Sequence, residues 1–336
     1  MAPTTTERRG TASRPAGTRT CELRFAAMGT QGHIVVVGGS PALAAQGARR
    51  VAELEGRWSR FRSTSELSAI NRAEGTELIV SDDTVTLVEI MVRAWHATGG
   101  RFDPTLHDAI VGLGYGTDWI DVEVDTDLPP AAHSPGCAGI EVDRDLHRVR
   151  VPNGVHLDPG GLGKGLAADL VAGELMAAGA QGVLVNIGGD IRTMGTPPSG
   201  ESWLIDVEDP HDPAGRLATV AVADGGVATS ASWKRHWSGP EGERHHLIDP
   251  FTGRPMDRPW GSVTVVATTA WYAEALTKQA FFDGELDRRC NAAAMFWHPN
   301  GSTRLAGDRP EVWIRVEAGT NGTETDLHHD RIGAAR

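Results

Sequence analysis

The first sixty residues show the two periodicities that distinguish strands from helices. Residues 21–38 alternate between apolar and polar positions and end in the apolar run 33–37, which predicts a strand or hairpin at the start of a sheet. Ser40-Pro41 then predicts the start of a helix, since serine is a frequent N-cap and proline suits the first turn. The apolar positions from Leu43 to Trp58 fall on one face of that helix, as a helix packed on a sheet requires.

The rest of the chain mixes helices and strands. Asp82-Asp83 is expected to cap a second helix, and Gly99-Gly100 to end it. A third helix is predicted over 165–178 and a last one over 270–282, while 118–155 indicates loop and short strands. Strands are predicted at 182–187, 203–207, 217–222, 262–267, 293–297 and 312–316. No regular β-α-β repeat occurs, so an α+β fold is favoured over a doubly wound α/β fold.

Length and composition narrow the class of protein. A chain of 336 residues with 40% hydrophobic residues is long enough for one large domain or two joined lobes. Its net charge of −12 argues against binding to nucleic acid, which depends on lysine and arginine contacts to phosphates. Cys21, Cys137 and Cys290 are far apart and have no zinc-ligand spacing, which favours a reducing compartment.

The two ends of the chain differ from its centre. Residues 1–20 are polar and lack the apolar segment of a signal peptide, and no stretch of the sequence is apolar enough to span a membrane. We therefore expect a cytoplasmic protein with a folded domain over 21–317. Residues 1–20 and 318–336 are expected to be disordered tails.

The segment from His156 to Gly195 carries the strongest chemical signal. It contains Asp158, the run from Gly161 to Gly165 with Lys164 within it, and an expected helix after that run. Glycines let the backbone approach a ligand, and a lysine at a helix start adds positive charge beside exposed N–H groups, which suits a phosphate or pyrophosphate. The run matches neither the P-loop nor the Rossmann pattern, and an ordinary glycine-rich turn is the alternative.

Three further groups are candidates. Thr229-Ser230 is expected to follow a strand, where it binds polar ligand atoms or makes a simple turn. One histidine of His245-His246 is a candidate acid, base or phosphate ligand, and the alternative is an exposed hairpin in which Asp249 forms an Asx turn. Glu274 and Lys278 share a helix face, as a surface ion pair or with Glu274 as a metal ligand.

Taken in order, these segments resemble the ApbE family of FAD:protein FMN transferases from about Phe25 to about Val316. Eight segments carry the resemblance: Met28–Thr30, Ser65–Asn71, Gly100–Thr105, Leu157–Gly165, Asn186–Asp190, Thr229-Ser230, His246–Gly253 and Ala273–Lys278. The resemblance implies a two-lobed α+β fold, related to the T-fold, with mixed sheets, packed helices and FAD bound between the lobes. It implies Mg²⁺-dependent cleavage of the FAD pyrophosphate, transfer of FMN to a Thr or Ser hydroxyl of an acceptor protein, and release of AMP.

The resemblance also assigns roles to single residues. His246 and Lys164 are expected to be catalytic, His246 beside the phosphates and Lys164 neutralising the charge of the pyrophosphate. The FAD-binding residues are expected to be Met28, Phe61, Arg101, Phe102, Asp103, Asp158, Lys164 and Ile248. The expected metal residues are Gly161 through its carbonyl, Glu274, Thr277 and Lys278. A second copy of the chain is a further candidate partner, in a homodimer.

The sequence departs from the family pattern at the metal. Where the family usually reads Ala-Asp-Ala-Leu-x-Thr, this chain has Glu274 in place of Asp and Lys278 in place of Thr. Thr277 lies about 100° around the helix from Lys278, so it cannot simply replace the lost hydroxyl. The ammonium of Lys278 either repels the metal or serves as a fixed counter-charge. Three hypotheses follow: an active transferase, an FAD-binding protein without transferase activity, or an FAD pyrophosphatase that gives FMN and AMP.

Overall fold

The computed structural model describes residues 19–116, 130–212, 215–240 and 242–316. The first strand begins at Thr20, so the expected tails lie outside the described residues except at positions 19 and 20. The predicted loop region 118–155 is described only from residue 130 onward. Two short strands lie within that part, as predicted.

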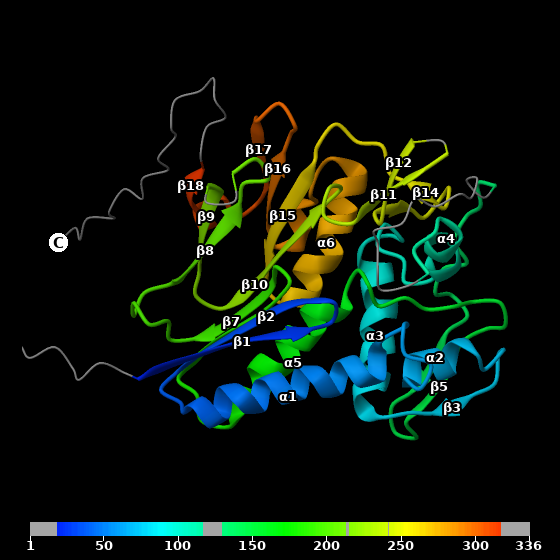
Figure 1. Ribbon diagram of the computed structural model, residues 1–336, viewed down its shortest axis with the longest axis horizontal. Coiled ribbons are helices and arrows are strands. Elements are labelled where there is room, and N and C mark those ends of the chain that lie inside the picture. Colours follow the sequence, from blue (N-terminus) through cyan, green and yellow to red (C-terminus); the bar gives the residue numbers. More distant parts are fainter. Residues whose placement is uncertain (1–18, 117–129, 213–214, 241, 317–336) are drawn as a thin grey trace, which may run out of the picture.

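An eight-stranded sheet forms the centre of the molecule (Figure 1). Every strand pair in it is antiparallel, which excludes the doubly wound alternative and confirms the α+β class. In spatial order its strands are β1 (Thr20–Ala27), β2 (Thr30–Val37), β6 (Gly182–Ile187), β7 (Asp190–Gly195), β10 (Gly225–Ala231), β15 (Ser262–Ala267), β16 (Ala293–Trp297) and β17 (Thr303–Gly307).

Three helices cover one face of this sheet: α1 (Pro41–Trp58), α5 (Gly163–Ala177) and α6 (Ala270–Asp283) (Figure 1). α1 has the predicted apolar stripe, since Val51, Leu54 and Trp58 are buried. α5 begins two residues earlier than predicted. α5 is buried on most of its faces because it packs against α1, α6 and the sheet, and α6 is likewise largely buried between α5 and the sheet.

A three-stranded sheet of β8 (Trp203–Glu208), β9 (Arg216–Val222) and β18 (Trp313–Val316) packs on the large sheet. Its inward side chains form a second core with β7, β10 and β16, in which Trp313 and Val220 are almost fully buried. The sequence predicted these three strands, and in the structure Trp203–Glu208 alternates between buried and exposed positions. It did not predict β7 or β17, and of β10 it predicted only that a strand precedes Thr229.

The second lobe is an insertion between β2 and β6. It contains α2 (Glu66–Asn71), α3 (Asp82–Ala97), α4 (His107–Gly112) and a small sheet of β3 (Leu78–Ile79), β5 (Arg148–Arg150) and β4 (Glu141–Asp143). The helix predicted at Asp82 is α3, but its N-cap is Ser81, whose hydroxyl accepts a hydrogen bond from the Thr84 amide. α2 and α4 were not predicted, because each has only six residues.

Two short hairpins, β11 (His236–Gly239) with β12 (Gly242–His245) and β13 (Ile248–Asp249) with β14 (Arg254–Pro255), pack near α4. They carry His245-His246 to the space between the lobes. The described residues also form two 3₁₀ turns, Arg288–Cys290 and Pro310–Val312.

The junction of α5 and α6 fixes the positions of the site residues on both helices. A Cβ at Gly165 would lie 2.6 Å from the carbonyl oxygen of Ala270, so only glycine allows this approach. From the next turn of α5, Asp169 accepts hydrogen bonds from the amides of Ala270 and Trp271 at 2.9 and 2.8 Å and thereby caps α6. The glycine after Lys164 therefore serves helix packing.

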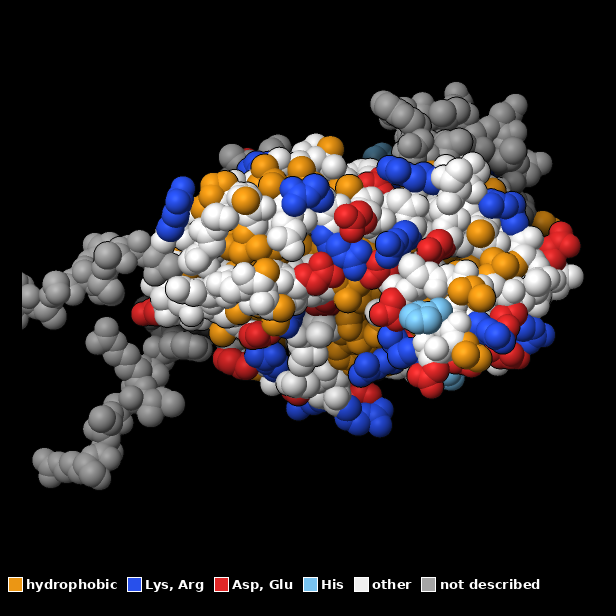
Figure 2. Space-filling view, turned by 90° about the horizontal axis from the view of Figure 1, so that it is seen from below, with side chains coloured by type: hydrophobic (Ala, Val, Ile, Leu, Met, Phe, Trp, Pro, Cys, Tyr) orange, Lys and Arg blue, Asp and Glu red, His pale blue; other side chains and the backbone are white. Residues whose placement is uncertain are grey.

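The face seen from below in Figure 2 carries basic and acidic side chains next to one another. Ion pairs link the helices: Arg50 on α1 pairs with Asp83 on α3 at 2.6 Å and with Glu174 on α5 at 2.9 Å. None of the helices in the described residues is both long and apolar enough to cross a bilayer.

Candidate functional site between the lobes

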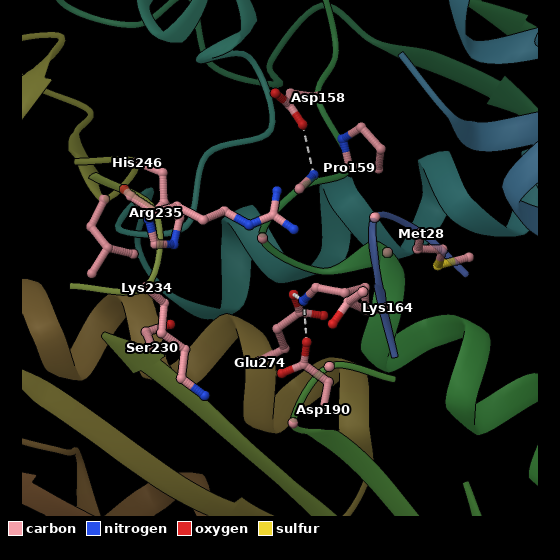
Figure 3. A pocket seen from close by; sticks show the side chains of 18 of the residues that line it. Met28, Asp158, Pro159, Lys164, Asp190, Ser230, Lys234, Arg235, His246 and Glu274 are labelled. Carbon is pink, nitrogen blue, oxygen red and sulfur yellow. Dashed lines mark hydrogen bonds and ion pairs between the residues drawn. The ribbon is translucent and has the colours of Figure 1, made fainter. Parts of the chain in front are cut away.

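A cavity of about 880 Å³ lies between the two lobes (Figure 3). Its walls come from the β1–β2 turn, the segment after α1, the glycine-rich turn before α5, the start of β7, the β12–β13 connection and α6. Twelve of the thirteen site residues predicted from the sequence line it: Met28, Phe61, Arg101, Phe102, Asp103, Asp158, Gly161, Lys164, His246, Ile248, Glu274 and Lys278. These residues, far apart in the sequence, therefore line one cavity, and their roles stay predictions.

Thr277 is not among the lining residues. Its hydroxyl is fully buried, lies 2.6 Å from the hydroxyl of Ser230 on β10, and donates to the carbonyl of Glu274 at 2.7 Å. The structure thus places Thr277 between α6 and the sheet, away from the pocket that the other expected metal residues line. It also places Thr229-Ser230 within β10 instead of after a strand.

A cluster of four charged side chains forms one wall of the pocket. Lys164 forms an ion pair with Asp190 and lies 2.9 Å from Oε1 of Glu274. Oε2 of Glu274 accepts a hydrogen bond from the Gly165 amide at 2.8 Å. Lys278 donates to the backbone carbonyl of Glu274 at 3.0 Å, and its Nζ is 3.8 Å from Oε1. Figure 3 shows Lys164, Asp190 and Glu274 converging from three different elements.

Burial and charge act in opposite directions on this cluster. Burial raises the pKa of Asp190 to about 6, and the nearby carboxylate of Glu274 adds to the effect. Burial opposes ionisation of Glu274 as well, but the ammonium groups of Lys164 and Lys278 outweigh it and lower its pKa. The same carboxylates raise the pKa of Lys164 in spite of its burial. Lys164 therefore stays charged while it faces the pocket.

Asp158 is bound to an arginine that the sequence did not single out. Its Oδ2 lies 2.9 Å from Nε of Arg60, whose side chain is only 6% exposed. Its Oδ1 accepts a hydrogen bond from the Gly160 amide at 2.7 Å, as Figure 3 shows. The Arg60 guanidinium also lies over the rings of Phe61 and Tyr115, 4.1 and 4.7 Å from their centroids. Asp158 thus ties the glycine-rich turn to a cationic, aromatic wall.

His246 presents a free ring nitrogen in this arrangement. Its Nδ1 lies 3.2 Å from the backbone carbonyl of Arg235, which can only accept, so Nδ1 carries the proton and Nε2 has the lone pair. Burial, together with the positive charges of Arg235 and Lys278, lowers the pKa of His246 to about 3. The imidazole is neutral near pH 7, as a general base must be.

This lowered pKa predicts how stability depends on pH. The unfolded chain binds a proton at His246 near pH 6.5 and the folded chain only near pH 3, so stability from this group is complete above pH 6.5 and is lost as the pH falls. We expect the wild type to lose about 1.4 kcal/mol per pH unit relative to a His246→Asn variant in that window. Urea unfolding of both proteins across the range measures this difference, and parallel curves would contradict it.

The Arg101-Phe102-Asp103 segment shapes the pocket wall, and its charged side chains are paired within the protein. All acceptor bonds of Asp103 are internal: Oδ1 accepts from Thr105, and Oδ2 accepts from Trp95 at 3.2 Å and Ser134 at 2.7 Å. Arg101 is paired with Asp283 at 3.0 Å. These contacts fix the turn that places the buried ring of Phe102 against Gly161.

Met28 occupies the two-residue turn between β1 and β2, with φ of +51°, a conformation that non-glycine residues rarely adopt. The turn projects it to the pocket edge opposite Lys234 and Arg235 in Figure 3. Phe61 is 39% exposed. An apolar side chain held on the pocket wall with such exposure provides area for a flat ligand.

Sequence reasoning missed Arg60, Asp190 as a charged group, Lys234 and Arg235. Each lies next to a segment that it did identify, but a single charged residue beside a motif gives no signal without the fold. Together they change the electrostatics: eight lysine and arginine side chains and six carboxylates line the pocket, in a chain whose net charge is −12. The pocket is positive relative to the rest of the molecule and therefore suits an anionic ligand.

A second group of potential metal ligands lies outside this cluster. Asp108 accepts from His156 at 2.8 Å and lies 2.8 Å from Nδ1 of His107, at the start of α4. Asp108 is 61% exposed in its side chain, and both histidines already use a ring nitrogen on it. Within the described residues these three side chains form a hydrogen-bonded cluster at the surface.

Comparison with known proteins decides the family. The model of the ApbE family matches residues 28–294, most of the chain. The chain belongs to the ApbE family. This confirms the resemblance seen in the eight segments, and it confirms the fold.

Named relatives of this ApbE family member are transferases. The FAD:protein FMN transferase of Klebsiella pneumoniae is 30% identical, over 79% of this chain and 78% of that protein. That of Vibrio cholerae is 29% identical, over 70% and 72%. The crystal structure of the ApbE protein of Thermotoga maritima superposes with a TM-score of 0.75 at 26% identity, covering 86% of this chain and 97% of that one.

Proposed function

We propose that this protein is an FAD:protein FMN transferase, which passes FMN from FAD to a Thr or Ser hydroxyl of an acceptor protein and releases AMP. Family membership and the transferase names of the relatives support the activity. The observation that carries it is the positive pocket with Lys164 anchored at one wall and the unprotonated Nε2 of His246 at another. The pocket volume is in the range of sites for ligands of this size.

The chemistry follows from these two groups. The pyrophosphate of FAD lies beside the ammonium of Lys164, which reduces the charge at phosphorus. Nε2 of His246 takes the proton of the acceptor hydroxyl, whose oxygen then attacks the phosphorus of the FMN half. The new P–O bond forms as the bond to the AMP oxygen breaks, and AMP leaves with the electron pair. The aromatic wall at Phe61 and the tie between Asp158 and Arg60 orient the flavin half.

The experiment is to incubate the full chain with FAD and an acceptor domain that carries a threonine flavinylation site. AMP release and covalent flavin on the acceptor are measured in parallel, with a Thr→Ala acceptor as the control. Equal amounts of AMP and flavinylated acceptor establish the transferase. AMP without flavinylated acceptor establishes an FAD pyrophosphatase, and FAD binding without AMP establishes a binding protein.

The acceptor protein, a cytoplasmic location and a homodimer stay predictions from the sequence. The dependence on Mg²⁺ implied by the family is a separate matter, because this chain has altered residues at that place.

We expect Asp158→Ala to weaken FAD binding by about tenfold or more, because the buried guanidinium of Arg60 loses its counter-charge and the turn at Gly160 loses its acceptor. Calorimetric titration with FAD measures the change. Asp158→Asn is the matched variant: it keeps the acceptor for the Gly160 amide but loses the charge, so it should be intermediate. Unchanged affinity in both variants would exclude this role.

A further inference from the structure

The pocket is the only place where this chain uses lysine. Of its 32 basic side chains three are lysines, Lys164, Lys234 and Lys278, and all three line the cavity. All the other basic side chains of this chain are arginines. An ammonium is a compact point charge with three donors, whereas a guanidinium is a broad planar group. A compact cation is what a site built for a small ion can accommodate.

Lys278 lies directly beside the glycine-rich turn. It follows Glu274 by one helical turn on α6, and its Nζ is held by the carbonyl of that residue at 3.0 Å. Its stem passes Gly161 so closely that a Cβ there would be 3.1 Å from Cε. The side chain is 16% exposed, on the pocket side. The ammonium therefore faces the ligand space between Gly161 and Glu274.

The residues present do not fit Mg²⁺. Mg²⁺ needs near-octahedral oxygen ligands at about 2.0–2.1 Å. Oε1 of Glu274 accepts from Lys164 at 2.9 Å, Oε2 accepts from the Gly165 amide at 2.8 Å, and the backbone oxygen accepts from Lys278 and Thr277. Asp190 is paired with Lys164. Two carboxylates are thus balanced by two ammonium groups, and all three oxygens of Glu274 already accept hydrogen bonds, so the cluster lacks the excess negative charge and the free Glu274 oxygens that would attract a divalent cation.

We propose that the ammonium of Lys278 replaces the divalent cation at this site, so that FAD binds and reacts without added Mg²⁺. With Lys164 it supplies two fixed positive charges to the pyrophosphate, already in place before the ligand arrives. This inference rests on the proposed function for the identity of the ligand.

Two variants of Lys278 test the inference by FAD affinity, read from flavin fluorescence in EDTA and in MgCl₂. The wild type is expected to bind equally in both. Lys278→Thr leaves two carboxylates with one ammonium and adds a hydroxyl, so affinity in EDTA should fall about 10- to 100-fold and Mg²⁺ should restore part of it. Lys278→Met keeps the stem against Gly161 without charge or ligand, so it should lose affinity with a smaller response to Mg²⁺.

Lys234→Thr is the matched control. It makes the same change in the same pocket, but Lys234 pairs at 2.8 Å with Glu208, whose side chain is 80% exposed at the rim. It should weaken binding without creating a response to Mg²⁺. If Mg²⁺ raised the FAD affinity of Lys234→Thr as much as that of Lys278→Thr, loss of any lysine charge in the pocket would be enough to make binding respond to Mg²⁺. That result would overturn the inference.

The remaining outcomes separate this inference from the proposed function. Wild-type affinity that rises with Mg²⁺, or AMP release that stops in EDTA, overturns the inference and leaves the transferase intact. Equal FAD affinity in EDTA and Mg²⁺ with no AMP under either condition overturns the transferase and supports the role of Lys278 in binding. Absence of FAD binding in all conditions overturns both.

Discussion

Replacement of Lys164 by methionine is expected to lower the free energy of unfolding by about 3–5 kcal/mol and to abolish measurable FAD binding. Lys164 is the shared partner of Asp190 and Glu274, whose side chains are 4% and 2% exposed. Without it the two buried carboxylates share a single ammonium, that of Lys278, whose Nζ is 3.8 Å from Oε1 of Glu274. Urea unfolding measures the stability, and calorimetry measures FAD binding.

The pH dependence of this loss gives a second test. In the variant the pKa of at least one carboxylate should lie further above its unfolded value than the pKa of about 6 that Asp190 has in the wild type. A raised folded-state pKa favours the folded state at low pH, so the defect should be largest at neutral pH and shrink toward about pH 4. Lys234→Met, which breaks an exposed ion pair, should cost no more than about 1 kcal/mol. A similarly small loss of stability in Lys164→Met would exclude the role of Lys164 as the shared partner of Asp190 and Glu274.

Replacement of His246 by asparagine should lower the rate of FMN transfer by about 10²- to 10⁴-fold, the contribution of a positioned general base. The asparagine amide can still donate to the Arg235 carbonyl, which now lies 3.2 Å from Nδ1, but it offers no basic nitrogen. FAD affinity should therefore change little. Single-turnover formation of flavinylated acceptor separates this chemical step from binding.

The adjacent histidine is the matched control. His245 donates from Nε2 to the Met256 carbonyl at 2.9 Å and accepts from the Leu247 amide at Nδ1, so both of its nitrogens are used within the hairpin segment. It does not line the pocket. His245→Asn should leave the transfer rate near that of the wild type. If both variants lost the same amount of transfer rate, the rate would depend on the structure of the connection between β12 and β13 and not on a general base at His246.

The sequence by itself determined the elements whose pattern is long and regular. The alternation over 21–38 predicted β1 and β2, and the apolar stripe from Leu43 to Trp58 predicted α1. It also determined the family and twelve of the residues that line the pocket, because motif residues are local in the chain. The bounds of β7 and β10 were missed because both strands are buried on both faces and lack alternation, and β17 was missed because it has no buried residue.

Only the tertiary structure decided what the site residues do to one another. Lys164 and Glu274 are 110 positions apart, and only the packing of α5 on α6 through Gly165 brings them to 2.9 Å. The same packing shows that this glycine serves the contact between helices, where the sequence suggested approach to a phosphate. The sequence showed that Lys278 departs from the family pattern. Whether a metal can still bind beside Lys278 depends on which oxygens are free, and hydrogen bonds between distant segments determine which oxygens those are.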